Sequence, residues 1–197
     1  MRYDSEHKEK TRQRVLKEAA KAIRAEGPHR IGVAAVMAKA GLTHGGFYAH
    51  FASKDDLVAA AIGRMFEEGR VRLEHETQGR TPAVGLCGYI DFYLSRAHRD
   101  TRAAGCPIPF LAADAPRLTK AARERFARGT AALGSAIAAR LTEAGHEGAE
   151  AEASSVLAEL VGALSLARAE PDPDRSAAIL ERSKTSLKHR LGLDTAP

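Results

Sequence analysis

The chain has 197 residues, of which 44% are hydrophobic, 28% charged and 5% aromatic. It contains 39 alanines against 15 valines and isoleucines, a balance that favours helix over strand. It has no apolar run of about 18 residues, which excludes a transmembrane span. The charged N-terminus lacks the apolar core of a secretory signal, and two cysteines are too few for a disulfide framework. We therefore expect a soluble, all-α protein of the cytoplasm with no membrane partner.

The positive charge is concentrated in the first third of the chain. Residues 1–60 carry 11 Lys or Arg against 7 Asp or Glu, whereas residues 61–197 carry 19 against 18. Nearly all of the net charge of +5 therefore lies at one end of the sequence. A basic segment on a nearly neutral body is typical of proteins that bind a polyanion, nucleic acid before membrane. Alone the signal is weak, because a solvated helix face is often basic too.

Hydrophobic spacing and helix-ending residues predict about nine helices. The first four are expected at about residues 8–26, 33–40, 44–50 and 54–76. The fifth runs from Thr81–Pro82 to a break at residues 99–107, and the last four cover about 107–113, 118–141, 148–169 and 174–191. The composition changes near residue 70, where the basic three-helix segment gives way to a larger helical body.

Residues 32–51 carry the strongest functional signal. A short helix, a turn at Gly41 and a second short helix form a helix-turn-helix, whose second helix can enter the major groove of DNA. The same corner also occurs in helical proteins that bind no nucleic acid, so the pattern alone leaves both interpretations open. Gly45 and Gly46 favour DNA, because glycines weaken so short a helix yet leave its exposed face free for a partner to approach closely.

The residues that follow these glycines divide into an inward and an outward set. Phe47 and Phe51 are four residues apart and are expected to pack this helix onto the first one. Tyr48 and His50 are expected to point outward, and Thr43 can cap the start of the helix.

The stretch resembles the DNA-binding domain of the tetracycline-repressor (TetR/AcrR) family of bacterial regulators. The shared pattern consists of Ala40-Gly41-Leu42-Thr43, Gly45-Gly46-Phe47-Tyr48, His50-Phe51 and Ser53-Lys54-Asp55-Asp56-Leu57. So many matched positions at fixed spacing make the resemblance specific. It implies a homodimer in which residues 9–69 form the DNA-binding domain, with the helix-turn-helix at about 32–51. Residues 70–197 would then form a divergent ligand-binding and dimerisation domain.

The resemblance also implies which residues meet DNA. It places these residues around the start of the third helix: at base edges Thr43, His44 and Gly46, and on phosphates Tyr48, His50 and Lys54. A Tyr hydroxyl and a Lys ammonium are suitable phosphate donors, and Lys54 opens a helix whose dipole favours an anion. The sequence departs from the family at Gly32, where a Thr or Ser cap is usual, and at Gly46, where Ala or Thr is frequent. Base readout would therefore depend more on His44.

Residues 160–167 indicate a contact between two chains. They carry no charge, whereas a helix on the surface of a monomer shows a charged face within about two turns. A helix central within one chain is the alternative that periodicity leaves open. With the resemblance, we expect a homodimer interface formed by the helices at 148–169 and 174–191 of both chains. Leu180, Leu187 and Leu191 are the expected contribution of the last helix.

The sequence contains no enzyme, metal or cofactor motif. GxSxG, GxGxxG, GxxxxGK[ST] and CxxC are absent, and neither His-Glu pair has the second His of HExxH. We expect no catalysis, no metal and no cofactor. The expected function is a ligand-responsive repressor that binds double-stranded DNA at a palindromic operator. A DNA-binding protein without an effector and a small-molecule binder with a vestigial helix-turn-helix are the alternatives.

An effector pocket is expected in the helical body, between the helices that cover residues 54–169. Apolar and aromatic walls with a few polar groups are typical of small-molecule cavities. The candidate lining residues are Phe66, Leu86, Tyr89, Ile90, Tyr93, Phe110, Phe126 and Leu133. The competing interpretation is that most of them are ordinary core residues, and the effector itself is unknown.

Cys106 is the candidate for a redox- or electrophile-sensing repressor. It precedes Pro107 at the expected start of a short helix, where the dipole lowers a thiol pKa, and Arg99 and Arg102 could add to this effect. A Gly-Cys at this place also resembles a branch of the family that senses oxidants and electrophiles. An inert cysteine at a crowded helix junction is the alternative. Cys87 is expected to be a small buried core residue.

Overall fold

The computed structural model describes residues 2–193, with side chains from residue 6 onward. The described chain is helical and contains no strand, which confirms the all-α prediction. The α-helices are α1 (Arg2–Glu26), α2 (Val33–Lys39), α3 (Lys54–Thr77), α4 (Pro82–Tyr93), α5 (Arg96–Asp100), α6 (Ile108–Leu111), α7 (Lys120–Glu143), α8 (Ala149–Ala169) and α9 (Pro173–Arg190). Short 3₁₀ helices are η1 (His44–Ala49), η2 (Arg102–Ala104) and η3 (Ala115–Arg117).

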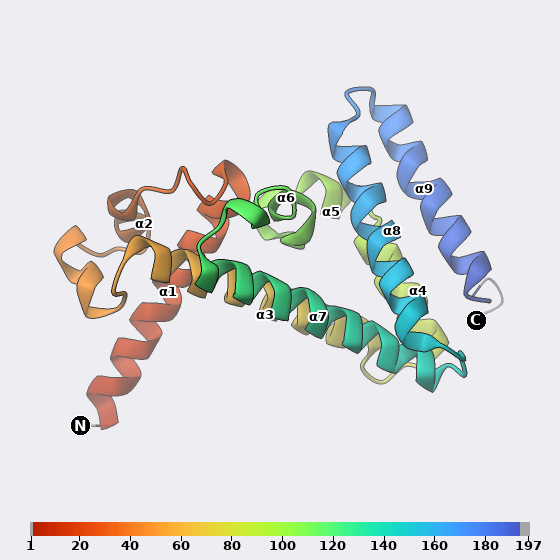
Figure 1. Ribbon diagram of the computed structural model, residues 1–197, viewed down its shortest axis with the longest axis horizontal. Coiled ribbons are helices and arrows are strands. Elements are labelled where there is room, and N and C mark those ends of the chain that lie inside the picture. The colour runs from red at the N-terminus through yellow and green to blue at the C-terminus, as the bar shows by residue number, and fades with distance from the viewer. Residues whose placement is uncertain (1, 194–197) are drawn as a thin grey trace.

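The helices form an elongated molecule with different elements at its two ends (Figure 1). α1, α2 and η1 lie at one end, and α8 and α9 lie side by side at the other. α3 and α7 run alongside each other between them, with α5 and α6 above. None of the helices in the described range has the length and apolarity needed to cross a bilayer.

α1 packs its apolar side against α3 and α2. Val15 and Ile23 are completely buried, as the spacing predicted. The helix begins at Arg2, earlier than the predicted start near Lys8, because the polar residues in between include no helix breaker. It ends at Gly27, whose φ of +88° is a left-handed conformation suited to glycine.

The turn between α2 and η1 depends on Gly41. Its φ is +72°, and the amide of Leu42 beyond it donates to the Met37 carbonyl at 2.9 Å, which closes the helix end. Phe47 and Phe51 are both buried, and their rings stack with centroids 5.7 Å apart. The predicted burial of both rings is therefore confirmed, although η1 packs chiefly against α2 and not against the first helix as expected. η1 is also a 3₁₀ helix and not the expected α-helix.

α3 and α7 approach each other closely at Gly129. A Cβ at this glycine would lie 2.2 Å from Cγ of Phe66, so only glycine accommodates the Phe66 ring there. The ring also meets Phe126 edge-on at 5.6 Å between centroids. This contact fixes the position of Phe66, which has a role in the cavity described below.

The predicted fifth helix divides into two, which corrects the sequence analysis. α4 ends at Tyr93, and Ser95 begins α5 by accepting a hydrogen bond from the His98 amide at 3.0 Å. Serine is a strong N-cap, so Ser95 starts a new helix although the apolar pattern of α4 continues past Tyr93. The break turns the chain so that His98 faces back toward the end of α4.

α8 and α9 pack against each other within one chain. Leu180, Leu187 and Leu191 are buried in this contact. The expectation that these leucines face a second chain is therefore wrong, because the protomer itself already covers them.

Candidate DNA-binding face and internal cavity

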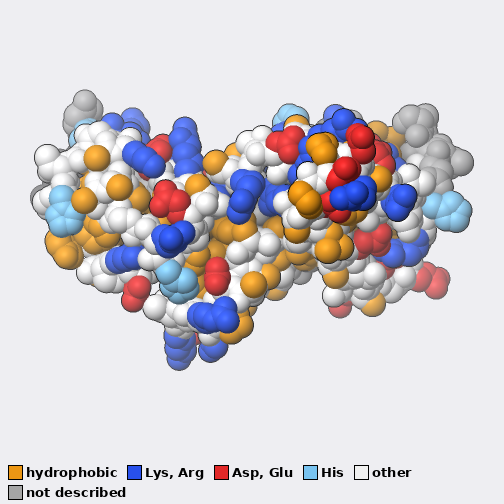
Figure 2. Space-filling view, turned by 90° about the horizontal axis from the view of Figure 1, so that it is seen from above, with side chains coloured by type: hydrophobic (Ala, Val, Ile, Leu, Met, Phe, Trp, Pro, Cys, Tyr) orange, Lys and Arg blue, Asp and Glu red, His pale blue; other side chains and the backbone are white. Residues whose placement is uncertain are grey.

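The six predicted DNA-contact residues lie at the end of the molecule formed by α1, α2 and η1. Three of them are exposed: Thr43, His44 and Tyr48, the last with 72% of its surface accessible. The other three are half-buried: Gly46, His50 and Lys54. In the space-filling view, Lys and Arg side chains predominate over this end, whereas acidic and basic side chains are mixed over α8 and α9 (Figure 2).

The two glycines of η1 are not required by the packing of the described chain. A Cβ added at Gly45 would meet nothing within 4 Å, and one at Gly46 would meet only Cε of Met37 at 3.8 Å. Neither glycine has a positive φ. Neither space nor backbone conformation therefore demands glycine here, and the two glycines leave this part of η1 without side chains.

The start of α3 is anchored by side chains. Ser53 Oγ accepts from the Asp56 amide at 3.1 Å, the bond of an N-cap, while Asp56 Oδ2 accepts from the Ala52 amide at 3.1 Å. Lys54 Nζ donates to the His29 carbonyl at 3.0 Å, which ties the loop after α1 to this helix. An ammonium has three donors, so two remain for a phosphate. Thr43 occupies the N-cap position of η1 but makes no capping hydrogen bond through its side chain.

His50 differs from its prediction. It is half-buried and does not project freely outward, and its Nδ1 atom is buried without a hydrogen-bond partner in the described chain. Burial, followed by the positive charges of Lys8 and Arg12, lowers the pKa of His50. The Arg12 guanidinium also lies 4.9 Å from the centre of the Phe51 ring. α1 therefore brings two basic residues beside this face that the motif did not reveal.

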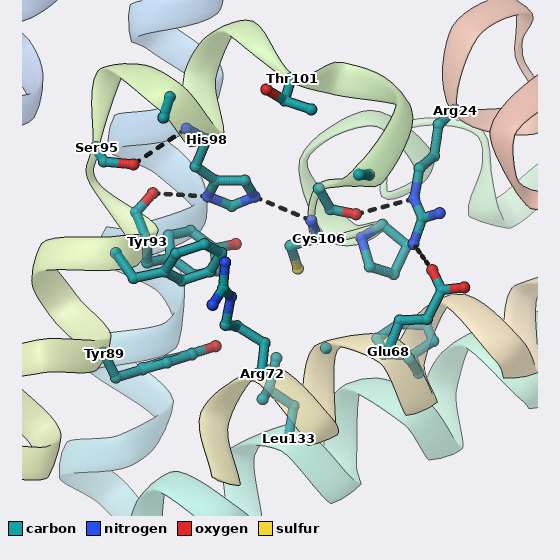
Figure 3. A pocket seen from close by; sticks show the side chains of 17 residues that line it. Arg24, Glu68, Arg72, Tyr89, Tyr93, Ser95, His98, Thr101, Cys106 and Leu133 are labelled. Carbon is teal, nitrogen blue, oxygen red and sulfur yellow. Dashed lines mark hydrogen bonds and ion pairs between the residues drawn. The ribbon is translucent and has the colours of Figure 1, made fainter. Parts of the chain in front are cut away.

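A cavity of about 320 Å³ lies between α1, α3, α4, α7 and the segment after α4 (Figure 3). Four of the eight predicted residues line it, namely Phe66, Tyr89, Tyr93 and Leu133. The other four do not, which corrects the prediction: Leu86 and Ile90 are buried in the core, and Phe110 and Phe126 pack half-buried against it. Hydrophobic spacing identifies inward-facing residues but does not distinguish a cavity wall from a solid core.

The polar wall of the cavity centres on Arg24 of α1, which is 3% exposed. Its Nε donates to the Gly105 carbonyl at 2.9 Å, and its Nη2 donates to Glu68 Oε2 at 2.7 Å. Glu68 also accepts from Arg64 Nε at 3.0 Å, so both carboxylate oxygens are engaged. Arg24 therefore links α1, α3 and the loop that carries Cys106.

His98 holds the opposite wall together. Its Nδ1 lies 2.8 Å from the Tyr93 carbonyl and its Nε2 accepts from the Cys106 amide at 3.1 Å. A carbonyl only accepts and an amide only donates, so this pair assigns a neutral imidazole protonated at Nδ1. Burial lowers the pKa of His98 to about 4, and the charges of Arg168, Arg72 and Arg24 act in the same direction.

This His98 arrangement predicts an acid-dependent loss of stability. Because the folded pKa lies below the ordinary value of 6.5, the stabilisation is complete above pH 6.5 and is lost as the pH falls toward about 4. We expect the loss to reach about 3 kcal/mol. Chemical denaturation of the wild type and of His98→Gln at several pH values measures it. The stability difference between the two proteins should shrink on acidification, and a constant difference would contradict the assignment.

Cys106 lines the cavity and is buried, and its sulfur points into it (Figure 3). Burial raises the pKa of the Cys106 thiol more than the nearby Tyr93 hydroxyl and the charges of Arg168 and Arg24 lower it. The expected lowering of this pKa is therefore wrong. α6 begins only at Ile108 and is too short to offset the loss of hydration. Cys87 is also corrected, since it is half-buried and not in the core.

Sequence reasoning missed the polar part of the cavity. Arg24 did carry a signal, because it follows Leu16 and Ala20 at helical spacing on the buried side of α1. A charged residue on an apolar stripe requires a buried partner. His98 gave no such signal, since its position depends on the break after α4. Arg72 gave none either, because it lies at an exposed position of α3.

Two family models match the sequence. The model described as "Bacterial regulatory proteins, tetR family" matches residues 15–61, which include the helix-turn-helix. The model described as "Transcriptional regulator LmrA/YxaF-like, C-terminal domain" matches residues 82–182. No curated protein shows significant sequence similarity to the chain.

Several solved structures share the fold. E. coli NemR in its reduced form is 20% identical, with a TM-score of 0.80 over 91% of this chain and 97% of that chain. A TetR transcriptional regulator from Chloroflexus aurantiacus J-10-FL is 26% identical, with a TM-score of 0.80 over 95% and 96%. A TetR-family regulator from Agrobacterium tumefaciens is 21% identical, with a TM-score of 0.78 over 93% and 98%.

Proposed function

Because the chain belongs to the tetR family of bacterial regulatory proteins and is therefore a DNA-binding transcriptional regulator, we propose that it is a repressor released from its operator by a small molecule. The observation that carries this proposal is the cavity whose wall includes Arg24 of α1. The same helix packs against α2 and carries Arg12, which covers the Phe51 ring beside η1. A ligand that displaces the Arg24 contacts would therefore act on the helix that supports the DNA-binding face.

This proposal assigns a separate function to each of the two expected domains. Residues 9–69 would bind DNA, with the helix-turn-helix at 32–51, and residues 70–197 would bind the effector and a second chain. The last four residues of that range lie outside the described part of the chain. α3 runs through the boundary without a break, which would couple the two functions mechanically. Since a transcriptional regulator acts on DNA, we propose that the protein acts in the cytoplasm.

A homodimer through α8 and α9 is proposed from the free surface of α8. Leu166 is 63% exposed within the charge-free stretch of residues 160–167. A Cβ added at Gly162 would meet nothing within 4 Å, so this face of the helix is open for close approach. An exposed leucine beside small residues on an uncharged face fits a symmetric contact with a second α8.

Operator binding tests the DNA-contact assignment. His44→Ala should lower affinity for the operator and relax discrimination at particular base pairs, because His44 is proposed to meet base edges. Lys54→Ala should weaken binding to all sequences and flatten the salt dependence, because a phosphate contact releases a counterion. Gel retardation with the DNA flanking the gene, at several salt concentrations, measures both effects. Unchanged operator affinity in both variants would contradict the assignment of η1 as the recognition segment.

A cavity-filling variant separates a ligand-responsive repressor from a DNA-binding protein without an effector. Gly69 of α3 lines the cavity, and a Cβ there would meet nothing within 4 Å. Gly69→Phe should therefore occupy the cavity without disturbing the fold, and Gly69→Ala is the matched control. If release depends on the cavity, the Phe variant should hold the operator in the presence of compounds that release the wild type and the Ala variant. Identical release of all three proteins would overturn the effector site.

Sensing through Cys106 is a second candidate, because its sulfur points into the same cavity. A quinone admitted there would accept the thiolate at a ring carbon, forming an S–C bond, and the thiol proton would end on a quinone oxygen. Because burial raises the thiol pKa, this addition should be slow near pH 7 and accelerate about tenfold per pH unit. Operator binding of the wild type and Cys106→Ser, before and after a quinone, is the measurement. Release only of the wild type supports sensing, and equal responses leave Cys106 a packing residue.

A further inference from the structure

We propose that the effector is a small planar aromatic compound that carries one anionic group, in the simplest form a carboxylate. The inference rests on the proposed effector site and assigns the chemical class of molecule that it takes. The observations that carry it are the aromatic walls of the cavity, its excess of arginine over free carboxylate, and a buried hydroxyl without an oxygen or nitrogen partner in the described chain.

The walls of the cavity favour a flat ring. Phe66, Tyr89, Phe92 and Tyr93 line it, together with Leu133 of α7. Tyr89 and Tyr93 meet edge-on with centroids 5.9 Å apart, and their hydroxyls point toward the same space (Figure 3). A volume of about 320 Å³ is at the small end of the range for ligand cavities, so a molecule of one or two rings fits.

The charges around the cavity favour an anion. Arg24 and Arg72 line it, and Glu68 is the one carboxylate among its lining residues. Both oxygens of Glu68 are already engaged by Arg24 and Arg64, so this carboxylate is not available to a cationic ligand. His98 is neutral at pH 7, because its pKa is lowered to about 4. Arg24 is paired with Glu68 and the 43% exposed Arg72 with Glu76, but each of these carboxylates is shared with a second arginine, Arg64 or Arg80. Positive charge therefore exceeds negative charge around the cavity, and a negative ligand would be attracted.

Arg72 is the group placed to hold the anion. Its guanidinium lies 4.0 Å from the centre of the Phe92 ring, and its Nη1 donates to Glu76 Oε1 at 3.2 Å. From α3 it reaches across the cavity toward Tyr93 of α4 (Figure 3). A guanidinium has five N–H donors in a rigid plane, so most of them remain for a carboxylate, which it binds in a two-point geometry. The stacked Phe92 ring limits the rotation of the group and so orients these donors.

The Tyr93 hydroxyl provides the second point of attachment. Tyr93 is 1% exposed and lines the cavity, and its hydroxyl has no oxygen or nitrogen partner within the described chain, only the Cys106 thiol beside it. The neighbouring Cys106 thiol is only a weak hydrogen-bonding group. Leaving a buried hydroxyl unsatisfied is costly, and an anionic oxygen of a ligand would remove that cost.

The test compares an acid with its isosteric amide on the full-length protein. Isothermal titration with 2-naphthoate and 2-naphthamide should show the acid binding at least about tenfold more tightly, as expected for charge-assisted hydrogen bonds. Arg72→Gln should remove that preference by weakening the acid at least about tenfold while changing the amide less than about twofold. Tyr93→Phe should also weaken the acid without lowering the unfolding temperature of the free protein, because the lost hydroxyl has only the weak Cys106 thiol as a partner in the described chain.

Equal affinity for acid and amide, equal weakening of both by Arg72→Gln, or no binding of the acid would each overturn the proposed ligand class. These outcomes are distinguishable from failure of the proposed function. Failure of the proposed function would be seen in operator binding without any ligand and in the release assay with Gly69→Phe. Neither measurement depends on the charge of the compound.

Discussion

Replacing Leu166 with Glu is expected to convert the dimer into monomers and to lower operator affinity by at least about a hundredfold. Leu166 is 63% exposed on α8 and would be buried against the second chain. A carboxylate placed in such a contact loses its hydration and faces its own symmetry copy, so both desolvation and repulsion oppose association. Light scattering coupled to size-exclusion chromatography measures the molecular mass. Gel retardation measures the operator affinity, which should fall because a monomer contacts only one half-site.

Val71→Glu provides the control for this experiment. Val71 is also a large exposed apolar residue, at 52%, but it lies on α3, away from α8. The same carboxylate there should leave the molecular mass unchanged. If Leu166→Glu remains a dimer, or if Val71→Glu dissociates equally, the interface does not involve the free face of α8.

Replacing Arg24 with Met should destabilise the protein by about 2–3 kcal/mol. Methionine retains the apolar stem but removes the hydrogen bonds to the Gly105 carbonyl and to Glu68, leaving the carbonyl unpaired in a buried place. Arg64→Met is the matched control, because it removes a half-exposed partner of the same Glu68 and should cost less than about 1 kcal/mol. Denaturant titration of the three proteins gives these values. If both variants lost the same free energy of unfolding, burial of Arg24 would make no additional contribution to stability.

The Arg24 variant should also respond differently to effector. If Arg24 transmits occupancy of the cavity to α1, Arg24→Met should bind 2-naphthoate yet release the operator incompletely. Binding measured by calorimetry and release measured by gel retardation separate these two effects. A variant that releases the operator as the wild type does would remove Arg24 from the coupling.

The sequence predicted most helices because their burial follows a simple period. Phe47 and Phe51 are buried, as their spacing predicted. The periodicity could not show that Leu180 and Leu187 are covered by their own chain, because an apolar face looks the same whether its partner is internal or a second molecule.

The candidate site was less predictable than the fold. Thr43 and His44 were identified by a local motif, and they lie exposed on one face as it implied. The cavity instead arises where Ser95 stops α4 and His98 turns back to bond the Cys106 amide. These contacts join residues that share no local pattern, and the pKa of Cys106 depends on burial that only the assembled fold provides.

Because α3 is continuous, a small tilt of this helix would be enough to disturb the contacts with DNA. Arg72 lies about 27 Å along the helix axis from Lys54, at about 1.5 Å per residue. Because α3 has no break between these residues, it would move as a rigid body, and a tilt near Arg72 would displace the Lys54 end the most. A tilt of about 5° at the cavity would displace Lys54 by about 2 Å, which exceeds the tolerance of a hydrogen bond to a phosphate. If the proposed effector acts through this cavity, a molecule of one or two rings would therefore be large enough to separate the protein from its operator without unfolding any part of it.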